Sequence, residues 1–190
     1  HADVPLNDLG RAQAAALAAR LTRDGADALW SSDLSRARET AEAVGAALGR
    51  EPVVTPLLRE IDIGRWEGLD GDTIAAREPD VMAALARGED VPRGGGETLA
   101  GFQARVVRGF EEAAAAAAGG TLVLVVHGGV VKVLVAHLLG LPRERSGRLT
   151  SGGNAGLSEV VFGPAGPQLV RLNDTAHLAG LDGAAAVDSA

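Results

Sequence analysis

The sequence predicts an α/β fold: a three-layer sandwich with a mostly parallel central sheet flanked by helices. Short apolar runs alternate with segments of helical periodicity along most of the chain. Residues 122–126 are a continuous, mostly β-branched run between turns, which is typical of a parallel strand covered on both faces. The chain has 190 residues, 46% of them hydrophobic, which is enough for the core of one domain.

The first half of the chain alternates helix and strand. Asn7 or Asp8 is expected to cap the first helix, and Ser31 or Ser32 the second, because short polar side chains accept hydrogen bonds from free helix N–H groups. Gly49 ends the second helix. The expected elements are a helix over 8–22, a strand over 26–30, a helix over 34–48, a strand over 52–55, a polar loop over 57–71 and a helix from Asp72 or Thr73 to Arg87.

The second half continues this alternation and then changes character. Thr98 is expected to cap a long helix that ends before Gly119-Gly120. The strand over 122–126 precedes a helix over 129–139. Two late strands over 156–162 and 168–172 flank a Gly/Pro-rich turn, so antiparallel pairing is an option for them. We expect one domain over 1–178 and a flexible tail over 179–190, which is rich in Ala, Gly and Asp.

Composition and charge exclude several classes of protein. The chain has no cysteine, so disulfides and thiolate metal sites are excluded, and no histidine cluster predicts a metal ion. The net charge is −7 and the chain has no run of basic residues, which argues against nucleic acid as a binding partner. Residues 121–139 are apolar but are interrupted by His127 and Lys132, which argues against a membrane span. No signal peptide is visible, and we expect a cytoplasmic protein.

Two strand-to-helix turns carry the residues expected to bind an anion. The first turn ends in Arg36, and the second contains His127, Gly128 and Gly129. Ligands of open α/β sheets bind at the carboxyl ends of the strands, where helix N-termini offer free N–H groups. An arginine adds a fork of donors for phosphate oxygens. The two turns therefore predict a phosphate pocket.

Each of these residues also has an interpretation without a ligand. Arg36 could pair with Asp33 or Glu39 on a solvated helix, and His127 could be a buried histidine whose hydrogen bonds are satisfied. A third segment offers an acid: Glu60 lies among alternating apolar residues near a tryptophan, surroundings that suit a general acid. Asp62 and Glu67 are equally plausible by spacing, and the residues alone do not choose among the three.

Five segments, in this order, resemble motifs of the histidine phosphatase superfamily in its phosphoglycerate-mutase-like branch. They span most of the chain, from Asp3 to about Leu178, which makes the resemblance specific. The segments are Asp3-Val4-Pro5-Leu6 with Gly10 and Gln13-Ala14, Ser31-Ser32-Asp33-Leu34-Ser35-Arg36-Ala37, Leu58-Arg59-Glu60 with Trp66-Glu67-Gly68, Gly96-Glu97-Thr98, and Val126-His127-Gly128-Gly129.

The resemblance implies a metal-independent mechanism with a phosphohistidine intermediate. Arg36, His127 and Gly128 would bind the phosphoryl group, and His127 would stabilise charge in the transition state. Glu60 would be the general acid for the leaving alcohol and then the base for water. The family's nucleophile is the histidine of an Arg-His-Gly strand, and no Arg-His-Gly occurs in residues 1–190. We therefore expect that the printed sequence is incomplete and that the chain as printed is inactive.

These observations predict a phosphomonoester hydrolase that acts on a small phosphorylated metabolite, without a cofactor. The short span between Gly68 and Gly94 favours a phosphatase over a mutase, because the family's mutases carry a longer insertion there. A phosphoglycerate-type mutase and a non-catalytic phosphate-binding relic are the alternatives. We expect a monomer or a homodimer with neither nucleic acid nor membrane as a partner.

Overall fold

The centre of the molecule is a parallel sheet of three strands. The computed structural model describes residues 2–181. The strands are β1 (Ala28–Ser32), β2 (Val53–Thr55) and β3 (Leu122–Val125), in the order β2-β1-β3. Ser31 of β1 lies opposite Val125 of β3 and Thr55 of β2 opposite Ser32. The carboxyl ends of β1 and β3 therefore lie side by side, as a phosphate pocket between the two turns requires.

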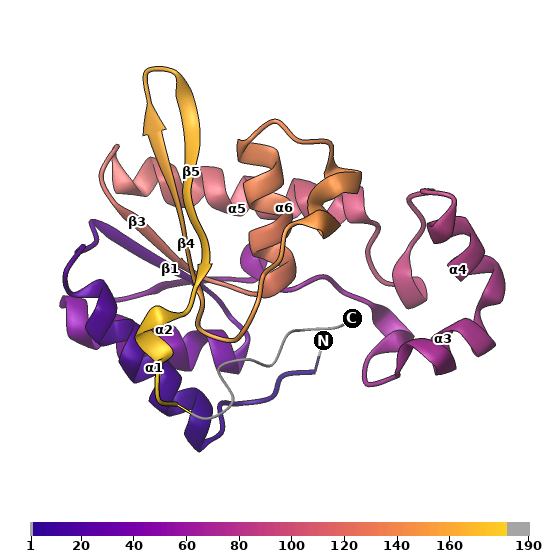
Figure 1. The fold of residues 1–190 in the computed structure, drawn as a ribbon, viewed down its shortest axis with the longest axis horizontal. Coiled ribbons are helices and arrows are strands. Elements are labelled where there is room, and N and C mark those ends of the chain that lie inside the picture. Colours follow the sequence, from indigo (N-terminus) through magenta and orange to yellow (C-terminus); the bar gives the residue numbers. More distant parts are fainter. Residues whose placement is uncertain (1, 182–190) are drawn as a thin grey trace.

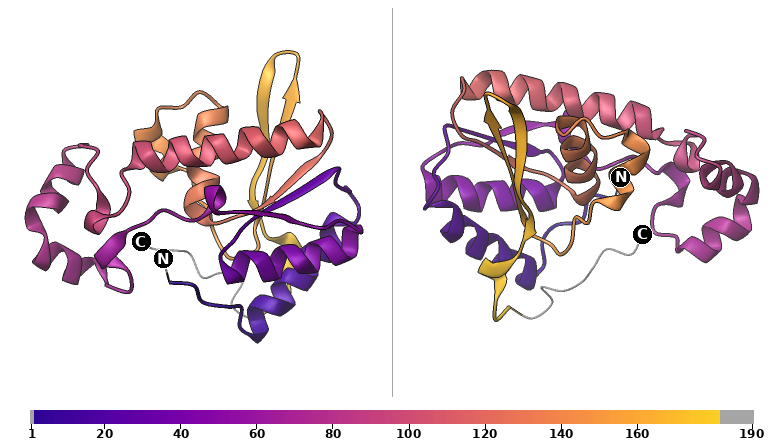
Figure 2. Two further views of the ribbon diagram at one scale, coloured as in Figure 1. Left: turned by 180° about the vertical axis from the view of Figure 1, so that it is seen from behind. Right: turned by 45° about the horizontal axis from the view of Figure 1, so that its top comes forward.

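Helices cover both faces of this sheet (Figures 1 and 2). One layer holds α1 (Asp8–Leu21) and α2 (Ser35–Leu48), and the other holds α5 (Leu99–Ala117) and α6 (Gly128–Leu138). Val125 packs into the core formed with α1 and α2, whereas its neighbour Leu124 packs into the core formed with α5 and α6. Successive side chains of a strand point to opposite faces, so one strand serves both cores. The predicted three-layer sandwich is confirmed.

The last two strands form a sheet of their own. β4 (Leu157–Gly163) and β5 (Gly166–Asp174) pair antiparallel, as the turn between them suggested. We expected a single central sheet, but β4 does not pair with β3. Among the described strands β3 pairs with β1 only, so its second edge has no strand beside it. Both faces of β3 are nevertheless packed against helices, as predicted: Val123 and Val125 contact the core on the α1 and α2 side, and Leu124 contacts the core on the α5 and α6 side.

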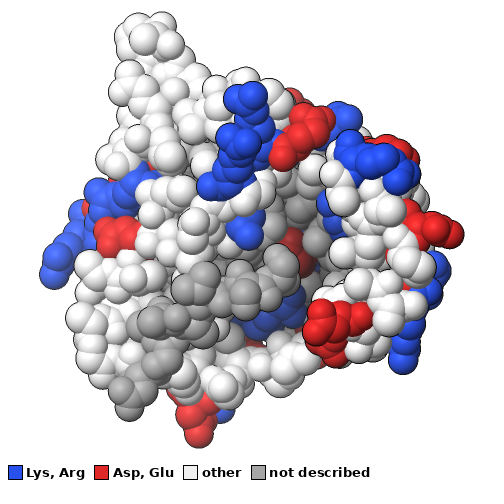
Figure 3. Space-filling view, turned by 45° about the vertical axis from the view of Figure 1, so that its right-hand side comes forward, with Lys and Arg blue, Asp and Glu red and all other residues white. Residues whose placement is uncertain are grey.

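The single helix predicted from Asp72 or Thr73 to Arg87 is wrong. The structure has α3 (Gly71–Arg77), capped by Asp70, and α4 (Pro79–Ala86). Proline has no N–H and disfavours helical backbone in the residue before it. Glu78 accordingly leaves the helical region, with φ −134° and ψ 57°. The pair of helices stands away from the sheet (Figure 1), and Figure 3 shows a hollow beside it that contains both basic and acidic side chains.

Two glycine turns join this helix pair to the rest of the domain. The backbone of Gly64 lies so close to Gly94 that a Cβ on Gly64 would come 2.3 Å from the Gly94 carbonyl oxygen. Both glycines also have positive φ, 52° and 53°. The remaining elements are short 3₁₀ turns: η1 (Pro56–Leu58), η2 (Gly64–Trp66), η3 (Arg93–Gly95), η4 (Arg143–Arg148) and η5 (Ala176–Leu178).

The predicted division into a domain over 1–178 and a flexible tail over 179–190 stays a prediction. Residues 182–190 lie outside the described residues. Up to residue 181, the chain closes with η5, whose Leu178 is fully buried. Within the described residues, none of the helices combines the length and apolar character that crossing a membrane requires.

Candidate active site

The turn after β1 is built around buried hydroxyls and a carboxylate from the N-terminal segment. Ser31 and Ser32 are fully buried. The Ser31 hydroxyl donates to the Ser32 carbonyl (2.8 Å), and the Ser32 hydroxyl accepts from the N–H of Leu34 (3.3 Å), the residue before α2. Neither serine accepts from an N–H of α2 itself, so the prediction that one of them caps this helix is wrong. Asp3 satisfies the first N–H of α2 instead: its Oδ1 accepts from the Ser35 backbone N–H (2.6 Å) and its Oδ2 from the Ser35 hydroxyl (2.9 Å). These bonds lower the pKa of Asp3.

Arg36 lies in the first turn of α2, half-buried, at the carboxyl end of the sheet. Its Nη1 donates to the Ala2 carbonyl (3.1 Å). Within residues 2–181 it pairs with neither of the two carboxylates considered above. Asp33 instead binds Arg59 through two hydrogen bonds (2.7 and 2.6 Å), and Glu39 lies 3.9 Å from Arg11. The guanidinium of Arg36 therefore has no acidic partner on its own helix.

His127 occupies the end of β3 and the N-cap position of α6. It has extended backbone (φ −117°, ψ 164°) and only 8% of the residue is exposed. Its Nε2 is buried and has no hydrogen-bond partner among the described residues, so the alternative of a satisfied buried histidine does not hold. Burial, together with the positive charges of Arg36 and Arg105, lowers the pKa of His127 to about 4. The ring is neutral at pH 7 and can donate through one N–H.

The carboxylate of Glu60 lies on the first turn of α6. Its Oε2 accepts from the backbone N–H of Gly129 (2.8 Å), and its Oε1 accepts from the N–H of Ile61 (2.8 Å). A Cβ on Gly129 would come 2.2 Å from Oε1, so only glycine leaves room for this contact. Gly128 is the first residue of α6 and separates His127 from Gly129. Glu60 thus contacts a residue, Gly129, that lies two positions after His127 in the sequence.

The two other acids proposed by spacing have different contacts. The Oδ1 of Asp62 accepts from the N–H of Gly64 (2.8 Å). The pKa of Glu67 is lowered, chiefly because the Ala2 backbone N–H donates to its carboxylate. Of the three candidates, Glu60 is the one that contacts the helix carrying Gly128 and Gly129.

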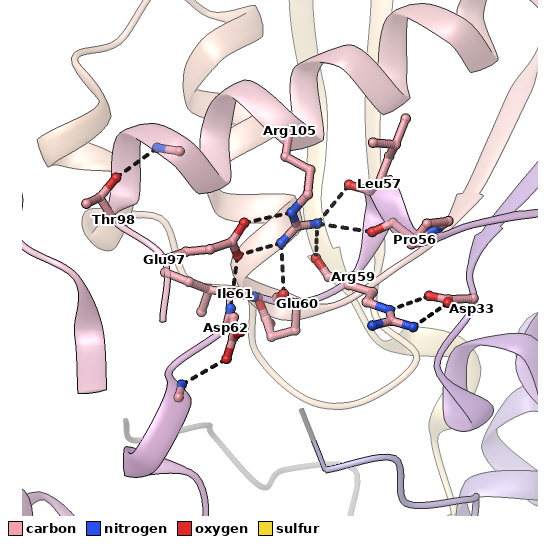
Figure 4. Close-up of polar contacts among 12 residues, drawn as sticks. Asp33, Pro56, Leu57, Arg59, Glu60, Ile61, Asp62, Glu97, Thr98 and Arg105 are labelled. Atoms are coloured by element: carbon pink, nitrogen blue, oxygen red, sulfur yellow. Dashed lines mark hydrogen bonds and ion pairs between the residues drawn. The ribbon is translucent and has the colours of Figure 1, made fainter. Parts of the chain in front are cut away.

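The site also contains Arg105 and Glu97, for which the sequence predicted no role. The Glu97 carboxylate binds Arg105, which in turn donates to backbone carbonyls of the segment that carries Glu60 (Figure 4). Gly96-Glu97-Thr98 resembles a family motif, but no role was expected for Glu97; the prediction that Thr98 caps α5 is confirmed, since it accepts from the Gly101 N–H (3.0 Å). One available signal was the place of Arg105 between the buried Phe102 and Val106 on the apolar stripe of α5.

The arrangement combines donors for an anion with a carboxyl group that can move a proton. Arg36, His127 and the start of α6 supply the donors, and Glu60 supplies the carboxyl group. No group of three or more His, Cys, Asp or Glu side chains suited to a metal ion occurs in the described part of the chain.

Several known proteins are similar to this chain. The model of the histidine phosphatase superfamily (branch 1) matches residues 1–175. Phosphoglycerate mutase-like protein 4 of Arabidopsis thaliana is 36% identical over 139 residues, which are 70% of this chain but only 60% of the relative. Glucosyl-3-phosphoglycerate phosphatase of Mycolicibacterium vanbaalenii is 34% identical over 160 residues, 80% of this chain and 71% of that protein.

A solved structure is similar over a larger part of both chains. It is a mycobacterial glucosyl-3-phosphoglycerate phosphatase in complex with inorganic phosphate. The TM-score is 0.81 and the identity 34%, and the match covers 93% of this chain and 90% of that one.

Proposed function

The chain belongs to the histidine phosphatase superfamily (branch 1), and we propose that it is a phosphatase that hydrolyses a phosphomonoester of a small metabolite. The observation that carries the proposal is the 2.8 Å hydrogen bond from the Gly129 N–H to Glu60. Gly129 lies two residues after His127, whose Nε2 has no partner in the part of the chain that the structure describes. A proton carrier and a donor for phosphoryl oxygens then meet at one helix N-terminus, where an anion is favoured.

The proposed reaction has two steps. In the first, a histidine nitrogen attacks phosphorus, the bond from phosphorus to the leaving oxygen breaks, and the Glu60 carboxyl gives its proton to that oxygen. In the second, the Glu60 carboxylate takes a proton from water, which attacks the phosphohistidine and releases phosphate. Arg36 and His127 donate to the phosphoryl oxygens throughout, and donors fixed in advance stabilise the charge that develops there.

The nucleophile of this proposal lies in the Arg-His-Gly strand implied by the resemblance, a motif that residues 1–190 do not contain. Among the described strands, one edge of β3 has no partner, and it offers a place for such a strand because β3 leads directly into His127. The proposed activity therefore requires a protein that carries this strand.

The leaving-group dependence of Glu60→Gln tests the proposal. We expect this variant to hydrolyse an alkyl phosphate about 10² to 10⁴ times more slowly, whereas p-nitrophenyl phosphate, whose leaving group needs no proton, is affected much less. Equal losses on both esters would contradict the acid role. Glu111→Gln, a change of the same kind on α5 away from Glu60, serves as the control.

A mutase is the second candidate, since one relative is named phosphoglycerate mutase-like protein 4. Release of inorganic phosphate from a phosphoglycerate derivative supports the phosphatase, and isomerisation without release supports the mutase. Binding of the ester without either reaction would leave a phosphate-binding relic. The proposal also includes independence of metal ions, so an excess of EDTA should leave the rate unchanged.

The proposal extends to setting and assembly. We expect a cytoplasmic protein that is a monomer or a homodimer, which cell fractionation and light scattering would measure.

A further inference from the structure

We propose that Arg105 is a positioning residue for Glu60, which it holds on the first turn of α6 by binding the backbone of the segment 56–60. The inference rests on the proposed role of Glu60 as the proton carrier. Arg105 lies on α5, 45 positions away from Glu60 in the sequence, and touches this segment from the helix layer (Figure 4).

Arg105 binds four carbonyl groups of the segment, those of Pro56, Leu57, Arg59 and Glu60. Its Nη1 donates to the carbonyl oxygens of Leu57 (2.9 Å) and Arg59 (3.0 Å), with Pro56 at 3.4 Å. Its Nη2 donates to the carbonyl oxygen of Glu60 itself (3.0 Å). One guanidinium therefore fixes the backbone up to the residue whose side chain reaches α6.

Glu97 and Phe102 hold Arg105 in the orientation that these bonds need. The two carboxylate oxygens of Glu97 accept from Nε (2.8 Å) and Nη2 (2.7 Å) of Arg105. The guanidinium carbon lies 5.2 Å from the centre of the Phe102 ring, which is 1% exposed. A planar fork with five donors can satisfy a carboxylate and several carbonyls together, which the three donors of a lysine cannot do in this geometry.

Glu97 also fixes the backbone that follows Glu60 in the sequence. Glu97 Oε2 accepts from the N–H of Asp62 (3.0 Å), and the backbone N–H of Glu97 donates to the Asp62 carbonyl (2.7 Å). Glu60 is thus held before and after its own position in the chain. A displacement of about 1 Å in a reacting group can cost about 10²-fold in rate, so this clamp bears directly on proton transfer.

Leaving-group dependence separates positioning from simple stabilisation of the fold. In a protein that carries the Arg-His-Gly strand, Arg105→Lys should lower kcat/KM for an alkyl phosphate about 10²-fold and for p-nitrophenyl phosphate less than about tenfold. In a Glu60→Gln background the same substitution should add nearly nothing on the alkyl ester, because the proton carrier is already absent. Equal losses on both esters, or losses that multiply in the double variant, would overturn the inference.

Arg108→Lys is the matched control on the same helix. The Arg108 side chain is 66% exposed and lies 3.8 Å from Glu112, one turn along α5, so its replacement should leave both rates unchanged. Should Arg105→Lys not fold, as judged by circular dichroism, Glu97→Gln removes the charge that orients Arg105 and should give the same selective loss to a smaller degree.

A readout without turnover keeps the inference separate from the proposed function. The amide signal of Gly129 in ¹H–¹⁵N spectra reports on the hydrogen bond that Gly129 donates to Glu60. At constant pH, Arg105→Lys should shift this signal as Glu60→Gln does, and Arg108→Lys should not. An unchanged Gly129 signal in Arg105→Lys would overturn the positioning role. A wild type that hydrolyses no phosphomonoester, together with the expected shift of the Gly129 signal in Arg105→Lys, would overturn only the proposed function.

Discussion

At the scale of single residues, His127 is buried, and its Nε2 has no hydrogen-bond partner within residues 2–181. Its pKa of about 4 lies below the ordinary value of 6.5, mainly because burial disfavours the charged ring. Between pH 6.5 and pH 4, His127 is protonated in the unfolded chain but stays neutral in the folded protein. The free energy of unfolding therefore falls as the pH drops through this window. Integrated from pH 6.5 to pH 5, the loss is about 2 kcal/mol.

We therefore expect wild type to lose about 2 kcal/mol more than His127→Gln when the pH is lowered from 7 to 5. Urea unfolding of both proteins at both pH values measures the difference, and the other titrating groups cancel in the comparison. A difference that stays constant with pH would contradict the low pKa of His127.

Gly129 is required because of a side chain that lies 69 positions away in the sequence. A Cβ at this position would come 2.2 Å from Glu60 Oε1, so Gly129→Ala should displace the carboxylate and reproduce the leaving-group selectivity of Glu60→Gln. Steady-state rates with an alkyl and an aryl phosphate measure it, with a loss of about 10²-fold on the alkyl ester. Gly71→Ala, where no atom lies within 4 Å of the new Cβ, is the control. Full alkyl phosphatase activity in Gly129→Ala would contradict the contact.

Local sequence signals located part of this site and missed the rest for a physical reason. Arg36 and His127 follow strands directly, and the register of β1 with β3 brings their turns together. Spacing left Glu60, Asp62 and Glu67 equal, because the contact of Glu60 with Gly129 depends on tertiary structure. The carbonyl contacts of Arg105 likewise have no signature in the segment that they hold.

At the scale of elements, the caps decide where helices begin. Thr98 accepts from the Gly101 N–H (3.0 Å) and starts α5, the helix that carries Arg105. Thr98→Ala should lower the free energy of unfolding by about 1 kcal/mol, and Thr98→Ser should retain most of it, because serine keeps the hydroxyl. Urea unfolding measures both. An equal loss in the serine variant would show that the methyl group, and not the cap, matters.

The mistaken element predictions have two different causes. Pro79 divides the predicted helix over 72–87 into two helices, because proline disfavours helical backbone in the residue before it. This signal is present in the local sequence. The cap of α2 could not be found locally, because Asp3 reaches Ser35 across 32 positions. Boundaries set by neighbouring residues are thus predictable from sequence, whereas boundaries set by distant side chains are not.

At the scale of the whole molecule, the positive charges of Arg36 and Arg105 lie near His127 although the chain as a whole is negatively charged. The protein carries a net charge of −7, so its overall field does not attract a phosphate ester. Arg36 and Arg105 nevertheless raise the local potential enough to contribute to the low pKa of His127. Substrate binding must therefore rely on short-range donors, which salt screens less than long-range attraction.

Among the described strands, β3 pairs with β1 alone, so one edge of β3 has no strand beside it. Unpaired strand edges present N–H and C=O groups to any strand that can reach them, and this edge ends at His127. A parallel strand added there would end beside His127 and Glu60, where the proposed mechanism needs its nucleophile. We expect β3 amides not bonded to β1 to exchange hydrogen rapidly in residues 1–190 expressed alone. In a protein that also carries the Arg-His-Gly strand they should exchange at least about tenfold more slowly. Amides of β1, which has a strand on each side, should be protected in both proteins. Equal exchange of β3 in both would mean that no strand pairs at this edge and that the nucleophile must reach Glu60 by another route.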